Sequence, residues 1–130
     1  LFEEPRYVIR HAARHFYELP EDTIREKTFC CGGGAGLGND ENIEMRMRGG
    51  MPRAMAVRHV KERHDVNRLA CICAIDRSTL SALMDYWVPG VTVMGVHELL
   101  SNALVMKGEK ERTTDLRGEP LKERTDDETL

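Results

Sequence analysis

Short apolar runs alternate with helical patterns along most of this chain, and this alternation most limits the folds that it can adopt. The expected strands are residues 27–31, 67–72 and 91–96, and the expected helices are residues 5–18, one starting near 41, one starting near 76, and 97–106. Strands that alternate with helices pair in parallel, with the helices as crossovers on the faces of the sheet. The sequence therefore predicts an α/β fold: a small parallel sheet of about three strands with flanking helices.

Proline, glycine and acidic residues mark the expected helix boundaries. Pro5 suits the first turn of a helix, and Asp76 suits an N-cap. The second helical pattern, which begins near residue 41 and continues to Val57, contains Gly49-Gly50 and Pro52. Proline in a helix interior removes a hydrogen bond and clashes with the preceding turn, so we expect a kink or two short helices there.

Composition divides the chain into residues 1–106, which form the expected domain, and residues 107–130. Fourteen of the last 24 residues are charged, which predicts a disordered, solvated tail. The net charge of −3 gives no signal for a nucleic-acid partner, and no apolar run reaches the ~20 residues of a membrane span. The start at Leu1 has no Met and no signal-peptide pattern, so we expect the C-terminal part of a longer cytoplasmic protein.

Four cysteines fall into two tight groups, Cys30-Cys31 and Cys71-Ile72-Cys73. Each group ends an expected strand, and the carboxyl ends of parallel strands meet at one edge of the sheet, where ligands bind. Each group also precedes a helix, whose positive N-terminal end favours thiolates. We therefore expect all four thiols to hold one metal centre. A disulfide framework is disfavoured because neighbouring cysteines do not readily pair, whereas buried structural thiols and a zinc site stay open as alternatives.

A glycine-rich run follows the first cysteine group and belongs to the expected site. Its candidate cofactor-binding residues are Gly32, Gly33, Gly34 and Gly36. Glycine lets the backbone approach a bulky inorganic core closely, and its N–H can bond cluster sulfurs. The run matches neither GxGxxG nor a P-loop, so it gives little support to a nucleotide site.

The string Cys-Cys-Gly-Gly-Gly at 30–34, followed about forty residues later by a second close cysteine pair, resembles the CCG-domain (heterodisulfide reductase B-like) iron–sulfur family. That family includes the heterodisulfide reductase B subunit and the iron–sulfur subunit of glycolate oxidase. Its pattern begins with a further cysteine, which would precede Leu1. Its last pair is CxxC, whereas the pair here is one residue shorter. Asp76 is a conceivable substitute ligand, although we favour its capping role.

Three stretches are similar to one branch of the family, subunit K (DsrK) of the Dsr membrane complex of dissimilatory sulfur metabolism. They are residues 29–40, 46–50 and 69–77. This resemblance implies an oxidoreductase subunit that carries out disulfide chemistry at a [4Fe–4S] cluster ligated by Cys30, Cys31, Cys71 and Cys73. It implies two partners, a membrane quinone-reactive subunit and a small sulfur-carrier protein with reactive cysteines. The subunit would be cytoplasmic and peripheral to the inner membrane, and this piece alone is expected to be inactive.

Two other functions remain open at this point. One is the iron–sulfur subunit of a hydroxy-acid (glycolate or lactate) oxidase complex, and the other is a non-enzymatic zinc-stabilised interaction domain. Basic residues also crowd residues 46–63, where we favour a solvated helix face. The alternatives for this segment are a docking surface for an acidic partner or charge compensation for the cluster.

Overall fold

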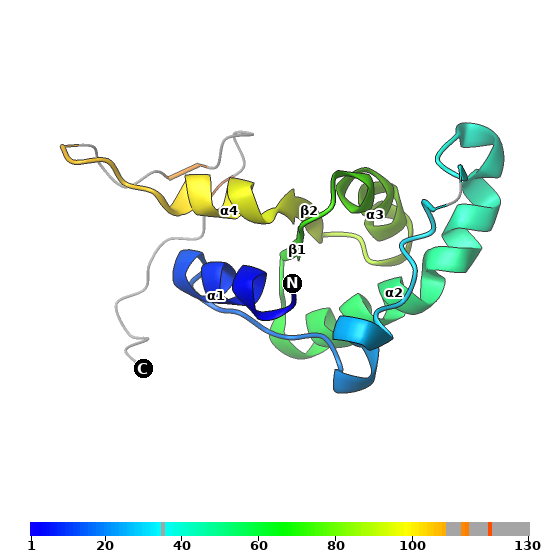
Figure 1. Cartoon of the computed structure of the whole chain (residues 1–130), viewed down its shortest axis with the longest axis horizontal. Coiled ribbons are helices and arrows are strands. Elements are labelled where there is room, and N and C mark those ends of the chain that lie inside the picture. The colour runs from blue at the N-terminus through cyan, green and yellow to red at the C-terminus, as the bar shows by residue number, and fades with distance from the viewer. Residues whose placement is uncertain (35, 109–112, 115–119, 121–130) are drawn as a thin grey trace.

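The computed structural model describes residues 1–34, 36–108, 113, 114 and 120, and within them four α-helices and a two-stranded sheet (Figure 1). The α-helices are α1 (Glu3–Ala12), α2 (Ile43–His64), α3 (Ala74–Trp87) and α4 (Val96–Ala103). The strands are β1 (Arg68–Cys71) and β2 (Thr92–Gly95). Three short 3₁₀ helices cover Glu21–Thr23, Arg25–Lys27 and Asp40–Asn42. The prediction for the tail, residues 107–130, falls largely outside the described residues.

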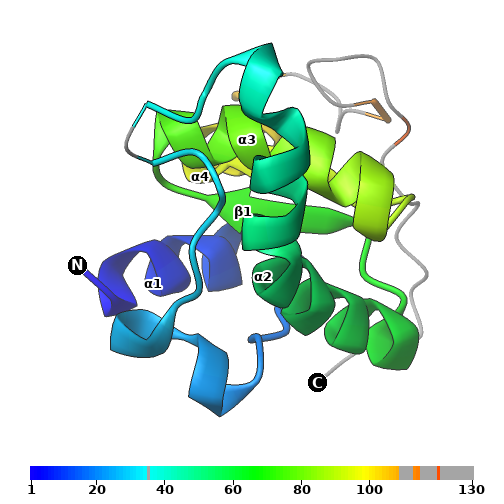
Figure 2. The same ribbon diagram turned by 90° about the vertical axis from the view of Figure 1, so that its right-hand side faces the viewer.

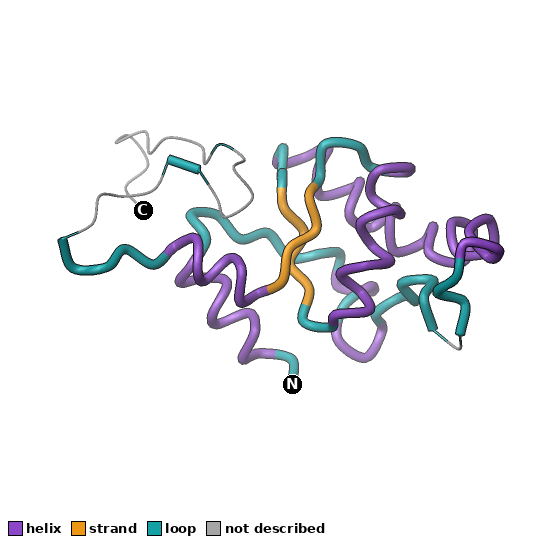
Figure 3. Tube along the Cα trace, turned by 90° about the horizontal axis from the view of Figure 1, so that it is seen from above, coloured by secondary structure: helices purple, strands orange, loops and turns teal. Residues whose placement is uncertain are grey.

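The sheet is parallel, with β1 and β2 in register from Arg68 opposite Thr92 to Cys71 opposite Gly95. Helix α3 connects the two strands, as the βαβ prediction requires. The α/β class is therefore confirmed. In the tube view the two strands lie between the α1–α4 pair and the α2–α3 pair (Figure 3).

The prediction of a strand at residues 27–31 is wrong. Residue 27 ends a 3₁₀ helix, and residues 28–31 belong to no strand. The glycines that follow are packed against α2 and α3, so the segment passes between these helices instead of pairing with β1. Its residues are consequently exposed as far as Cys30 and become fully buried only at Gly32.

Helix α2 is one continuous helix that bends near its middle, as both ribbon views show (Figure 2). Pro52 lies inside it, where its ring and its missing N–H disturb the preceding turn. The expected kink is confirmed. The bend allows the N-terminal half to run beside the glycine-rich loop while the C-terminal half covers the core.

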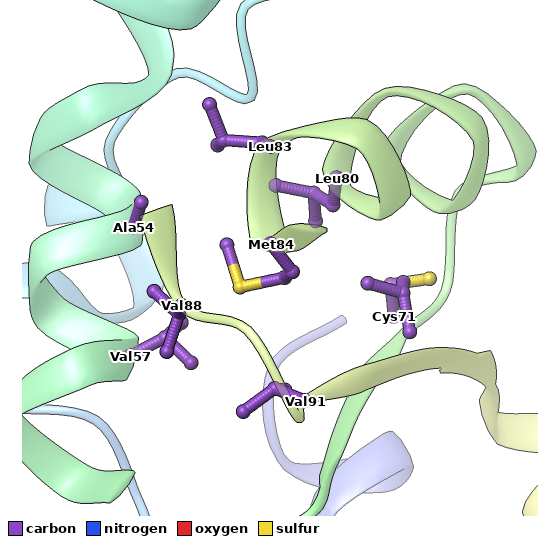
Figure 4. Packing of buried hydrophobic residues seen from close by; sticks show 9 residues of the cluster. Ala54, Val57, Cys71, Leu80, Leu83, Met84, Val88 and Val91 are labelled. Atoms are coloured by element: carbon purple, nitrogen blue, oxygen red, sulfur yellow. The ribbon is translucent and has the colours of Figure 1, made fainter. Parts of the chain in front are cut away.

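The core lies between α2, α3 and the sheet (Figure 4). Leu80, Leu83 and Met84 of α3 are at most 1 % exposed, and they meet Val57 of α2 and Val93 of β2 in one cluster. Burying side chains of this size stabilises the fold by about 1.5–3 kcal/mol each. The core thus fixes α3 relative to α2, which decides where the cysteine-bearing segments lie.

Helix α4 begins directly after β2 and is tied to α3. The Gly95 N–H donates to Glu98 Oε2 at 2.8 Å, and Arg77 Nη2 donates to Glu98 Oε1 at 2.6 Å. A carboxylate in the first turn also favours the helix dipole. Among the described residues, no helix is both long and apolar enough to cross a membrane.

Candidate cysteine-rich metal centre

The Cys-Cys-Gly segment runs against the N-terminal half of α2. A Cβ built on Gly50 would stand 3.2 Å from the Cys31 carbonyl oxygen, and a Cβ built on Gly32 would stand 2.7 Å from the Arg46 carbonyl oxygen. Gly32 has φ +83, which L-residues rarely adopt. The segment and the helix therefore meet backbone to backbone, and glycine is required on both sides of the contact.

The same segment touches α3 through its next residue. A Cβ on Gly33 would lie 2.3 Å from Thr79 Cγ2, so this glycine too is required by packing. Gly34 and Gly36 are exposed, and a Cβ on either would meet nothing within 4 Å. The four candidate cofactor-binding glycines thus fall into two classes: Gly32 and Gly33 are wedged between the helices, and Gly34 and Gly36 face open space.

The second cysteine group spans the end of β1 and the start of α3. Cys71 is the last residue of β1 and is 5 % exposed, and its Sγ donates to the Met94 carbonyl oxygen across the sheet at 3.5 Å. Burial, together with a smaller effect of the negative charge of Asp76, raises the pKa of the Cys71 thiol to about 11. Cys73 is exposed and is the N-cap residue of α3. Asp76 lies in the first turn of α3, so its predicted role as N-cap is wrong.

Cys31 and Cys71 both lie at the hydrophobic core cluster, whereas Cys30 and Cys73 are exposed. Cys31 is partly buried and packs against the core cluster that contains Cys71, although 39 residues separate them in the sequence. Cys30 is exposed, and its Sγ accepts the Gly32 N–H at 3.3 Å. Within the described part of the chain, no three His, Cys, Asp or Glu side chains form a group that could hold a metal ion.

Arg53 of α2 interacts with the residue before the first cysteine group and with Cys71 of the second. Its Nη1 donates to the carbonyl oxygen of Phe29, the residue before Cys30, at 3.0 Å. Its positive charge also reaches the Cys71 thiol and lowers the pKa of that thiol against the larger effect of burial. The side-chain Nε of Arg53 is buried and has no hydrogen-bond partner among the described residues.

The basic segment of residues 46–63 therefore divides into two kinds of arginine. Arg48 and Arg58 fit the predicted solvated face, since they form ion pairs with Glu44 and Glu62 one helical turn away. Arg46 does not: it is only 7 % exposed, and its Nε is also without a partner in the described residues. The sequence analysis did not separate the two kinds; in the structure, the close backbone contact at Gly50 marks the buried face of the same helix.

These residues fit an iron–sulfur cluster in donor type, in charge and in backbone shape. Four thiols supply the ligands that such clusters take, two unpartnered buried guanidinium nitrogens supply positive charge, and the glycines leave room at the backbone. The thiols are not gathered as a ligand set. Cys71 would have to turn away from Met94 to join such a set.

Comparisons with known proteins agree with the iron–sulfur interpretation. The chain is 52 % identical over 126 residues to "Hdr-like menaquinol oxidoreductase iron-sulfur subunit 2" of Archaeoglobus fulgidus, and 47 % identical over 127 residues to "Hdr-like menaquinol oxidoreductase iron-sulfur subunit" of Archaeoglobus profundus. These alignments cover 94 % and 95 % of the chain but 23 % of each relative, so the chain spans about a quarter of their length. No protein-family model and no solved structure matches it.

Proposed function

We propose that this chain is the cysteine-rich part of an Hdr-like iron–sulfur redox subunit and that it binds a cluster through Cys30, Cys31, Cys71 and Cys73. The observation that carries the proposal is that the partly buried Cys31 packs against the core cluster that contains Cys71, from a distant point of the chain. The names of two relatives about half identical to it over nearly its whole length support the same chemistry.

The finer proposal concerns the type of cluster and its surroundings. We take the cluster to be [4Fe–4S] and residues 1–106 to be a CCG-type domain. Both relatives are named as menaquinol oxidoreductase subunits, which favours a quinone-linked membrane complex over a hydroxy-acid oxidase. The partners would be a quinone-reactive membrane subunit and a small sulfur-carrier protein, as the resemblance to Dsr subunit K implies, and the subunit would be cytoplasmic.

The chain's own residues have distinct tasks in this proposal. A bound cluster would supply one-electron redox chemistry beside a protein disulfide. Gly32 and Gly33 hold the Cys-Cys segment between α2 and α3, which fixes where the first two thiols lie. Cys73 is the N-cap residue of α3 and lies at the positive end of that helix, which favours a bound anionic group.

Metal analysis of the full-length gene product, purified without oxygen, tests the proposal. We expect iron and acid-labile sulfide, a brown colour, and loss of part of the iron in Cys31→Ser with little change in helix content. Ser replaces the thiolate by a weaker ligand of similar size. Ser78→Ala removes an exposed hydroxyl from α3 and serves as the control, because it should leave the iron content unchanged.

Two results would contradict the proposal. Full iron content in Cys31→Ser means that this residue is not a ligand. Colourless protein with stoichiometric zinc that is lost in Cys31→Ser would assign the thiols to a zinc-stabilised interaction domain instead.

A further inference from the structure

We infer that Arg46 and Arg53 are the counter-charges for an anionic, thiolate-ligated iron–sulfur cluster held at the Cys-Cys-Gly segment. This inference rests on the proposed function and goes beyond it, because it assigns a role to two residues outside the cysteine and glycine motifs. Both arginines lie on α2, seven residues apart, and therefore on the same face of the helix.

The Cys-Cys-Gly segment runs along α2 from Arg53 to Arg46. The Cys31 carbonyl is packed at Gly50, which lies one turn after Arg46 and just before Arg53. Gly32 contacts the backbone of Arg46, and Phe29 accepts a hydrogen bond from Arg53. One arginine thus lies near each end of the segment.

Burial makes the charge of Arg46 costly unless an anion lies near it. Arg46 is only 7 % exposed, and arginine is the side chain whose positive charge proteins carry at buried and interface sites. Buried charges are stable when they are paired and hydrogen-bonded, yet the Nε of Arg46 has no partner in the described residues. The same holds for the Nε of the half-buried Arg53.

Neither arginine has an acidic neighbour one turn away on its own helix. The positions three and four residues away are Asn42, Ile43, Gly49 and Gly50 for Arg46, and Gly49, Gly50, Ala56 and Val57 for Arg53. Exposed Arg48 and Arg58 do have such partners. The two inner arginines are therefore left for a negative group that α2 does not supply, and thiolates bound to iron are the anion that the neighbouring cysteines can provide.

Neutral substitutions of similar size test this inference in the full-length gene product. The variants are Arg46→Met and Arg53→Met, with Arg46→Lys and Arg53→Lys to restore the charge. Arg48→Met is the matched control, because it removes the same charge from an exposed position of the same helix. Each protein is reconstituted with ferrous iron and sulfide without oxygen. Iron release to a chelator and the urea unfolding midpoint of the iron-free form are then measured.

We expect iron release from both Met variants to be at least about tenfold faster than from the wild type, because tenfold corresponds to the loss of one stabilising charge interaction of ordinary size. The Lys variants should release iron more slowly than the Met variants, and Arg48→Met should release it at the wild-type rate. In the iron-free form, Arg46→Met should keep or raise the urea midpoint, because it removes an unpartnered buried charge. A lowered midpoint in the iron-free form would assign the arginines to folding and overturn the inference.

The cysteine variant separates the two ideas. Iron that depends on Cys31 but is released at the wild-type rate from both Met variants overturns only the role of the arginines. Iron that does not depend on Cys31 overturns the proposed function and this inference together.

Discussion

Replacing Gly50 by alanine should loosen the contact between the Cys-Cys-Gly segment and α2. The new Cβ would stand 2.8 and 2.9 Å from the two terminal carbons of Leu83 and 3.2 Å from the Cys31 carbonyl oxygen. Leu83 is 1 % exposed and has little room to yield. Either the leucine or the cysteine segment must therefore move.

The neighbouring Gly49 provides a matched control for the size of this effect. A Cβ at that position would meet nothing within 4 Å, and the residue is exposed on the same helix. Alanine in a helix interior is favoured over glycine by about 1 kcal/mol at either position. Overpacking in a core costs about 1–3 kcal/mol, which applies only to Gly50→Ala. We expect the two variants to differ in free energy of unfolding by about 1–3 kcal/mol, with Gly50→Ala the less stable.

Urea unfolding followed by the fluorescence of Trp87 measures this difference. Trp87 is the chain's one tryptophan, and its indole Nε1 donates to the Met47 carbonyl oxygen at 3.0 Å, so it reports on the packing of α2 against α3. A difference of about 2 kcal/mol shifts the midpoint by about 1 M urea. Equal midpoints for Gly49→Ala and Gly50→Ala would refute the close packing at Gly50.

Three further perturbations follow from the structure. The pKa of the Cys71 thiol is about 11 in the folded protein and 9.0 when unperturbed, so the folded state binds this proton more tightly. The free energy of unfolding should therefore fall as pH rises from 9 to 11, by about 1–2 kcal/mol more in the wild type than in Cys71→Ala. Urea titrations of the two proteins at each pH measure this difference. Glu98→Ala removes the acceptor for the Gly95 N–H and the partner of Arg77, and calorimetry should register a loss of about 1–2 kcal/mol; an unchanged melting temperature would count against that link. Leu80→Ala, at a fully buried position, should cost about 2–5 kcal/mol of unfolding free energy by urea titration.

The sequence predicted the elements whose local pattern agrees with their packing. Strands were expected at residues 67–72 and 91–96 with a helix between them, and the structure has them at 68–71 and 92–95. A kink or two short helices were expected around Pro52, and the structure has the kink. These predictions succeed because apolar alternation and proline act locally. The segment at residues 27–31 resembles a strand in composition. Its conformation is instead decided by the close contacts of the glycines after it with α2 and α3, which depend on tertiary structure.

The site was predictable in its ligands but not in its surroundings. Paired cysteines and a glycine run are visible in the sequence, and they indicated where metal chemistry would lie. That Arg46 is buried while Arg48 is exposed depends on which face of α2 meets the loop. Because basic residues crowd that segment, no spacing rule alone separated the two kinds.

The bend in α2 divides the helix into halves of unequal local stability. After Pro52 the helix buries apolar side chains, including those of Ala54, Val57 and Val60. Before Pro52 its buried residues are Arg46 and Gly50. The free energy of the local opening that permits hydrogen exchange should therefore be lower for backbone amides before the proline than for those after it. The half that contacts the cysteine loop could then separate and close again while the hydrophobic centre stays intact, so a prosthetic group could enter a protein that is already folded.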